Sequence, residues 1–183
     1  MIAGHLGIAG AVYAARRDSS LPWLLVAAMA PDGVDALYVV AGICNPHGLY
    51  SHTLPAAVLI AALTGAVAYF STDRRVTGAL AALLVLAHLP ADYVTGRKLF
   101  WPGGELMGLY LYGQPALDFA VESLLAVGGW WLVRSKGRAP RWATATLALA
   151  AVLLLQGMLD LAGARRGGVK PTACGHAERL AAR

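Results

Sequence analysis

Histidine and aspartate interrupt several otherwise apolar stretches of the sequence, and these side chains are best suited to chemistry. His88 and Asp92 are four residues apart, which places both on one face of a helix, about 5–6 Å from each other. Inside a membrane an Asp costs about 2.5–3.5 kcal/mol on insertion scales, so such residues usually mark a function. Imidazole and carboxylate groups together are typical ligands of zinc, or of manganese where carboxylates dominate. The pair therefore predicts part of a metal site.

Further acids and histidines occur in comparable settings. Asp32 and Asp35 follow Pro31, and Asp118 and Glu122 form an acidic pair four residues apart. Like charges this close in an apolar environment repel, so one must be protonated or a cation must lie between them. The candidate metal ligands are His5, Asp32, His52, His88, Asp92 and Asp118, and the candidate catalytic carboxylates are Asp35 and Glu122.

Several of these residues also have a simpler interpretation. His5 could be a buried hydrogen-bonding residue, and His47 could be a loop residue rather than a ligand. Asp32 and Asp118 could each cap a helix. A cap needs no histidine, so this interpretation does not account for His88. A proton or ion pathway also collects acids and histidines inside a membrane, and it is the main alternative to a metal site.

The composition is that of a membrane protein. Hydrophobic residues make up 58% of the 183 residues, charged residues 14%, and mean hydropathy is +0.58, whereas soluble domains have roughly 45–50% and 25%. No Asp, Glu, Lys or Arg occurs between Ala36 and Thr72 or between Trp142 and Leu159. Because a spanning helix needs about 20 apolar residues, we predict an all-α, polytopic transmembrane bundle of about five to six hydrophobic helices.

The apolar segments lie near residues 2–15, 21–43, 53–71, 77–95, 116–133 and 142–163. Helix starts are expected at Ser19-Ser20 and Thr72-Asp73, and residues 54–70 and 142–159 should each be one helix. Residues 96–115 contain five glycines and two prolines, which predicts a loop. The chain then divides into a membrane domain, residues 1–163, and a polar, basic tail, residues 164–183. Cys44 and Cys174 form no CxxC motif and are expected to be unpaired thiols.

Basic residues cluster in short connections, at Arg16-Arg17, at Arg74-Arg75 and between Arg134 and Arg141. The positive-inside bias predicts that all three face the cytoplasm and that the loop 96–115 does not. This topology explains the net charge of +5, and no groove-reading motif accompanies the basic residues, so no nucleic-acid partner is expected. It also places the chemically active residues at the other end, so we predict one pocket there formed by His5, Asp32, His52, His88 and Asp92.

Five motifs follow one another within roughly residues 1–105. They are Gly-His5-Leu-Gly, Pro31-Asp32-Gly-Val-Asp35, His47-Gly-Leu-Tyr-Ser51-His52-Thr53, His88-x-x-x-Asp92 and Trp101-Pro102. Their order resembles the YdjM-type family of inner-membrane, metal-dependent hydrolases. Four positions depart from the family pattern: Asp35 comes one residue late, Gly48 stands where an arginine follows the first histidine, and Ser51 and Thr53 replace a threonine and a serine. The family is in turn similar to zinc-dependent phospholipase C, which implies that Asp118 and Glu122 form a final metal-binding pair.

Together these inferences predict a membrane-bound, metal-dependent hydrolase of the bacterial inner membrane. Its substrate would be a phosphoester or ester of a lipid or another molecule near the membrane, and its partners would be the bilayer and that substrate. A divalent metal, zinc or alternatively manganese, would activate water while a carboxylate accepts the proton. The alternatives are a small proton- or ion-coupled transporter or channel, and a purely structural membrane protein.

Overall fold

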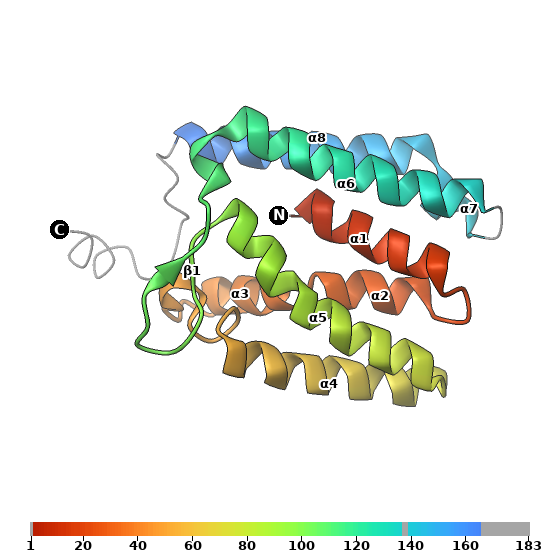
Figure 1. Ribbon diagram of the computed structural model, residues 1–183, viewed down its shortest axis with the longest axis horizontal. Helices are drawn as coiled ribbons and strands as arrows, with labels where there is room; N and C mark the ends of the chain where they lie inside the picture. The colour runs from red at the N-terminus through yellow and green to blue at the C-terminus, as the bar shows by residue number, and fades with distance from the viewer. Residues whose placement is uncertain (1, 137–138, 166–183) are drawn as a thin grey trace.

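Long apolar segments form the helices of a bundle whose axes run roughly in one direction (Figure 1). The computed structural model describes residues 2–136 and 139–165. The longest helices in this part of the chain are α4 (Leu54–Thr72), α5 (Arg75–Thr95), α6 (Pro115–Ser135) and α8 (Thr146–Arg165). Of these, α4, α5 and α6 are long and apolar enough to cross a membrane. The bent pair α2 (Leu21–Ala28) and α3 (Ala30–Val40) makes a fourth candidate span, and α1 (Ile2–Ala15) is a shorter apolar helix.

Large apolar side chains face outward rather than inward. Phe70 on α4 is 81% exposed and Leu147 on α8 is 82% exposed, whereas the buried apolar residues are mostly alanines. Lipid is as apolar as leucine, so a membrane helix gains little by turning large apolar side chains inward and packs through small residues instead. The chain is therefore an all-α membrane bundle, as its composition predicts.

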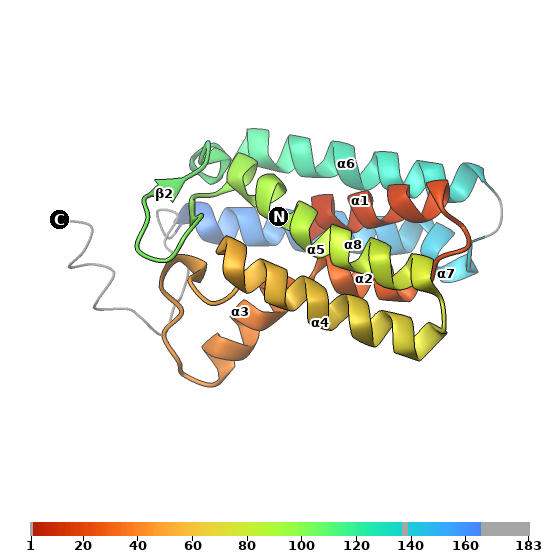
Figure 2. The same cartoon turned by 60° about the horizontal axis from the view of Figure 1, so that its bottom comes forward.

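Small residues allow α1 to lie directly against α6, and these two helices are neighbours in both views (Figures 1 and 2). A Cβ atom built on Gly129 of α6 would lie 2.0 Å from the carbonyl oxygen of Gly7 on α1. No side chain fits in that space, so glycine is required for the two backbones to approach so closely. This contact holds the start of α1, with His5, beside the rest of the bundle.

The segment that was expected to run from residue 21 to residue 43 is broken into two helices. α2 ends at Ala28, and α3 leaves it at an angle of 56°. Pro31 lies in the first turn of α3. A proline cannot donate a backbone hydrogen bond, and its ring collides with the carbonyl four residues before it, so Pro31 favours a break between α2 and α3. The break turns the first residues of α3 toward α5.

Short connections close one end of the bundle. They are η1 (Pro46–Gly48), the two-residue strands β1 (Lys98–Leu99) and β2 (Leu106–Met107), and η2 (Leu111–Gly113) (Figures 1 and 2). β1 and β2 pair antiparallel, with Lys98 opposite Met107. Two backbone bonds attach this hairpin to the bundle: Leu54 N donates to Phe100 O, and Leu109 N donates to Tyr93 O. The predicted loop thus contains a small fixed hairpin.

The basic connections lie at the opposite end (Figure 1). There Arg74 donates a hydrogen bond to the carbonyl of Asp18, and Lys136 donates one to the carbonyl of Ala14. The basic connections are therefore separated in space from the histidines and aspartates of the predicted pocket, as the sequence predicts. Residues 137–138 of the basic loop and residues 166–183 of the predicted tail lie outside the described residues.

Three local predictions were wrong. Residues 142–159 are not one helix, because Ala145 is extended and separates α7 (Arg141–Thr144) from α8; the flanking Thr144 and Thr146 are poor helix formers. The helix expected to start at Thr72-Asp73 begins at Arg75 instead. Asp73 ends α4 in the left-handed conformation, which Asp tolerates. Cys44 is disulfide-bonded rather than a free thiol, while Cys174 lies outside the described residues. The helix predicted over residues 54–70 is confirmed by α4.

Candidate metal centre

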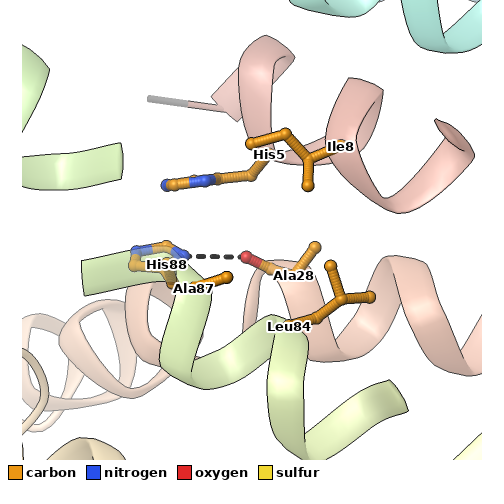
Figure 3. Close-up of a pocket in the computed structure, with 6 residues that line it drawn as sticks. All are labelled: His5, Ile8, Ala28, Leu84, Ala87 and His88. Atoms are coloured by element: carbon orange, nitrogen blue, oxygen red, sulfur yellow. Dashed lines mark hydrogen bonds between the residues drawn. The ribbon is translucent and has the colours of Figure 1, made fainter. Parts of the chain in front are cut away.

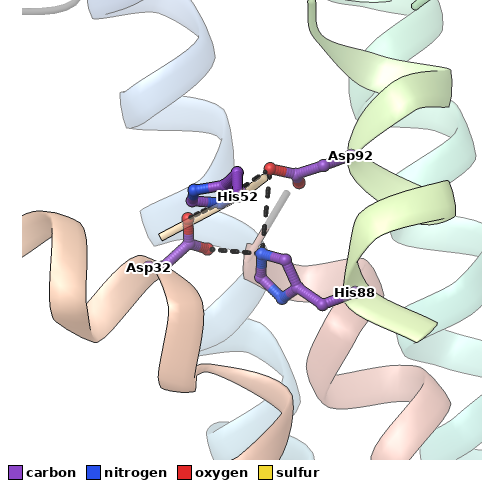
Figure 4. A group of neighbouring side chains, drawn as sticks. All are labelled: Asp32, His52, His88 and Asp92. Atoms are coloured by element: carbon purple, nitrogen blue, oxygen red, sulfur yellow. Dashed lines mark ion pairs between the residues drawn. The ribbon is translucent and has the colours of Figure 1, made fainter. Parts of the chain in front are cut away.

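Two helices and one connection bring four side chains together at the hairpin end of the bundle (Figure 4). Asp32 lies in the first turn of α3, and His52 lies just before α4. His88 and Asp92 lie one turn apart on α5, which continues as a helix past Pro90. Each of the four residues offers one ligand atom, and these atoms all lie within 4.8 Å of one another.

The distances between these atoms match the donor set of one metal ion. His52 Nε2 lies 3.5 Å from Asp32 Oδ1 and 3.1 Å from Asp92 Oδ2. His88 Nε2 lies 3.8 Å from Asp32 Oδ2 and 3.7 Å from Asp92 Oδ2. Ligands about 2.0–2.2 Å from a tetrahedral zinc ion lie about 3.3–3.6 Å from one another. The four nitrogen-to-oxygen distances therefore lie near this range, and one ligand atom from each residue lies within 4.8 Å of the others.

The tautomer of His88 is set by the break between α2 and α3. Its Nδ1 lies 2.8 Å from the carbonyl oxygen of Ala28, the last residue of α2 (Figure 3). A carbonyl only accepts, so Nδ1 must carry the proton, and in the neutral ring Nε2 then has a free lone pair. Nε2 is buried and has no hydrogen-bond partner among the described residues. A neutral histidine in this state is a ready metal ligand.

His52 is oriented by a chain of polar side chains. Ser51 Oγ lies 2.7 Å from His52 Nδ1 and donates a hydrogen bond to Asp35 Oδ1. Since the serine proton goes to Asp35, Nδ1 of His52 is the donor to Ser51, and Nε2 again faces the group with a free lone pair. Burial alone lowers the pKa of His52, but the carboxylates of Asp32 and Asp92 raise it above its ordinary value. A bound cation would replace that proton.

His5 contacts the four-residue group without belonging to it. Its Nε2 lies 3.2 Å from Asp92 Oδ1, and its ring stacks on the ring of His88 with centroids 3.7 Å apart. The two rings line a small cavity between α1, α2 and α5 (Figure 3). His5, expected to be a ligand, is thus placed where it can fix the positions of Asp92 and His88.

Asp35 lies beside the group, where other polar residues surround it. It accepts hydrogen bonds from Asn45 and Ser51, and its Oδ2 lies 3.7 Å from the ammonium nitrogen of Lys98. Lys98 comes from β1 and also lies 3.7 Å from Asp92 Oδ2. Asp35 therefore joins the group through its neighbours, although it is not one of the four residues whose ligand atoms cluster.

Access to the group is uneven. The side chains of His52, His88 and Asp92 are 3% exposed or less, whereas those of Asp32 and Asp35 are 21% and 24% exposed. Both exposed carboxylates belong to α3. The group is therefore most accessible along α3.

Asp118 and Glu122 belong to a second group, together with Asp160 of α8. Gln156 donates to Glu122 Oε1 at 3.0 Å and to Asp160 Oδ1 at 2.7 Å, and the backbone nitrogen of Gly4 lies 3.5 Å from Glu122 Oε2. Within the described residues, both carboxylate oxygens of Asp118 are buried without a hydrogen-bond partner. These two predicted site residues thus lie apart from the histidine cluster.

Several residues of these groups are not apparent from the sequence. Lys98 follows the end of α5 and reaches the site through the hairpin, so no helical spacing from His88 and Asp92 indicates it. Ser51 and Asn45 become informative only once Asp35 is seen beside them. Asp160 could have been found by the rule applied to the other acids, since it lies in an apolar stretch. His47, left open between ligand and loop residue, lies in η1 and outside the four-residue group.

The fold and the site together define a class of protein. It is a membrane bundle of α-helices with a buried cluster of histidines and aspartates at one end. The chain belongs to the YdjM inner membrane protein family, whose model matches residues 2–164. The match covers more of the chain than the motifs within residues 1–105 do. No curated protein and no solved structure matches the chain, so its similarity to zinc-dependent phospholipase C stays a prediction.

Proposed function

We propose that this protein is a metal-dependent hydrolase of the bacterial inner membrane, acting on an ester or phosphoester near the membrane surface. The observation that carries the proposal is the state of two histidines. The Nε2 atoms of His52 and His88 are buried, lack hydrogen-bond partners in the described part of the chain, and face two carboxylates. A buried polar atom without a partner costs free energy, and a cation would remove that cost.

Asp32, His52, His88 and Asp92 would hold the metal. Two imidazoles and two carboxylates suit zinc, and manganese is the alternative. When bound, such an ion polarises the scissile bond and lowers the pKa of a bound water toward about 7. His5 would keep Asp92 in place, and Ser51 would keep His52 in its binding tautomer.

Asp35 is the proposed general base. It lies on the exposed side of the group, and its carboxylate is held by Asn45 and Ser51, so it can accept a proton from a water molecule at the opening. Glu122 is the weaker candidate, because its carboxylate is held by Gln156 within the second group.

Removal of a ligand tests the proposal. His88→Ala and Asp92→Ala should each abolish stoichiometric zinc binding and lower hydrolysis at least a hundredfold while the protein still inserts into the membrane. Metal content of protein purified in detergent, measured by mass spectrometry, and turnover of p-nitrophenyl esters and phosphates are the readouts. His176→Ala, in the predicted polar tail, is the control and should match the wild type. Wild-type protein that holds no divalent metal when supplied with zinc or manganese would contradict the proposal.

A proton- or ion-coupled transporter is the second candidate, and the acidic group of Asp118, Glu122 and Asp160 favours it. Three carboxylates close together in a membrane bundle are typical of ion pathways. This candidate predicts ion or proton flux in proteoliposomes that Asp118→Asn abolishes, with no need for stoichiometric metal.

A further inference from the structure

We propose that Lys98 binds the negatively charged group of the substrate, and that the substrate of this site is therefore a phosphate ester rather than an uncharged ester. The inference rests on the proposed hydrolase function, and it concerns a residue outside the histidine and aspartate pattern. Lys98 is 5% exposed, and its ammonium nitrogen lies 3.7 Å from both Asp35 Oδ2 and Asp92 Oδ2. Lysine is almost never so deeply buried without a partner or a function.

The backbone fixes where this ammonium lies. Lys98 pairs with Met107 across the hairpin, and β1 packs against η1. On either side, the hairpin is bonded to the start of α4 through Phe100 and to α5 through Leu109. Lys98 therefore approaches the group from a strand that is held at several points, which keeps its charge in one place.

The loaded site is free of net negative charge only if Lys98 is counted. Asp32, Asp35 and Asp92 carry three negative charges when ionised, and the histidines are neutral when they act as ligands. A divalent cation offsets two of these charges, and Lys98 offsets the third. Without Lys98 the loaded site would keep one negative charge and repel an anionic substrate.

Lys98 also lies where it can reach a bound substrate. Asp35 is on the exposed side of the group and Asp92 is on the buried side, and the ammonium contacts both. An anion that enters along α3 would meet the metal position and the ammonium together. When Asp92 binds a metal, it shares its negative charge with the ion, which leaves Lys98 more of its positive charge for that anion.

A phosphate group matches these two cationic centres. It carries up to two negative charges on several oxygens, so one oxygen can bind the metal while another accepts a hydrogen bond from lysine, a common phosphate-binding residue. A carboxylic ester has no charge before it reacts, so Lys98 would contribute little to binding it. The same chemistry applies to a lipid phosphate headgroup and to a soluble phosphate ester.

The test compares Lys98 variants of the full-length protein in detergent. Zinc binding and the binding of inorganic phosphate to the zinc-loaded protein are measured separately by calorimetry. Lys98→Met should bind zinc with wild-type stoichiometry and phosphate at least tenfold more weakly, while Lys98→Arg should stay within about threefold of the wild type. Arg97→Met is the matched control, because it removes one positive charge from the neighbouring, exposed residue, which lies over the ring of Tyr110. It should leave phosphate binding unchanged.

Substrate turnover provides a second readout. Lys98→Met should lower kcat/KM for p-nitrophenyl phosphate at least tenfold more than it lowers kcat/KM for p-nitrophenyl acetate. Turnover of phosphatidic acid in micelles or of glycerol phosphate in solution would support the inference and identify the source of the phosphate. Cleavage of carboxylic esters alone would overturn it.

The outcomes separate this inference from the function on which it rests. If Lys98→Met binds zinc and phosphate as the wild type does, the role of Lys98 is wrong and the hydrolase proposal stands. If the wild type binds no metal, both fail. Lys98→Gln, which keeps a polar group near Asp35, covers the case in which Lys98→Met does not fold. Loss of folding in both variants would make Lys98 a structural residue and overturn the inference.

Discussion

Both histidines of the four-residue group offer Nε2 because Nδ1 is already occupied. In His88 the partner is a backbone carbonyl, and in His52 it is the Ser51 hydroxyl, which in turn donates to Asp35. Partners of this kind orient a histidine toward a metal and raise its basicity. The site therefore depends on residues that would never touch the metal, and Ser51 is one of them.

Ser51→Ala should weaken zinc binding about 10-fold to 100-fold without changing its stoichiometry, because His52 loses the partner that keeps its Nε2 lone pair free. Calorimetric titration of zinc into the purified protein measures this effect. Ser135→Ala removes an exposed hydroxyl at the opposite end of the bundle and should have no effect. Equal zinc affinity in Ser51→Ala and the wild type would remove Ser51 from the site.

Among the helices, the break between α2 and α3 contributes most to the site. It ends α2 at Ala28, whose carbonyl then binds His88, and it starts α3 at the angle that brings Asp32 to the group. The last carbonyls of a helix have no partner within it, so one is free to accept from a side chain. α1 contributes through its close contact with α6, which holds His5 against His88.

Gly129→Ala should destabilise the bundle by about 1–3 kcal/mol, because its Cβ would lie 2.0 Å from the carbonyl oxygen of Gly7 and force α1 away from α6. Thermal unfolding in detergent measures the change. Gly128→Ala is the matched control: it alters the same helix one residue away, where an added Cβ meets nothing within 4 Å. It should be neutral or slightly stabilising, and similar unfolding of the two variants would contradict the packing described for α1 and α6.

In the whole molecule, the basic connections and the histidine cluster occupy opposite ends. The basic end contains the contacts of Arg74 and Lys136, and the other end contains the histidine cluster and the hairpin (Figure 1). Positive residues are retained on the cytoplasmic side of a membrane. The site should therefore open toward the outer face of the inner membrane.

Labelling of single cysteines in intact cells tests this orientation. A cysteine in place of exposed Glu105, in the hairpin, should react with a membrane-impermeant thiol reagent, whereas one in place of exposed Ser135, at the basic end, should not. The unsubstituted protein gives the background, to which disulfide-bonded Cys44 should not contribute. The opposite labelling pattern would invert the topology and place the site in the cytoplasm.

The amino-acid sequence by itself determined the class of fold and indicated the four residues of the group. Hydropathy over stretches such as residues 54–70 predicts membrane helices, because the length of a spanning helix depends only on the thickness of the bilayer. Acids and histidines in those stretches stand out because burying them in lipid is costly. Asp32, His52, His88 and Asp92 were all recognisable in this way.

Only the tertiary structure decided how the remaining residues are arranged. It separates Asp118 and Glu122 from the histidines, places His5 beside the group, and brings Lys98 and Ser51 to it. It also divides residues 142–159 at Ala145. Hydropathy and spacing describe one segment at a time, whereas these features depend on helix packing, on one backbone carbonyl and on a hairpin. Two of the contacts that complete the site, between His5 and Asp92 and between His88 and Ala28, join segments far apart in the sequence, so no local pattern records them.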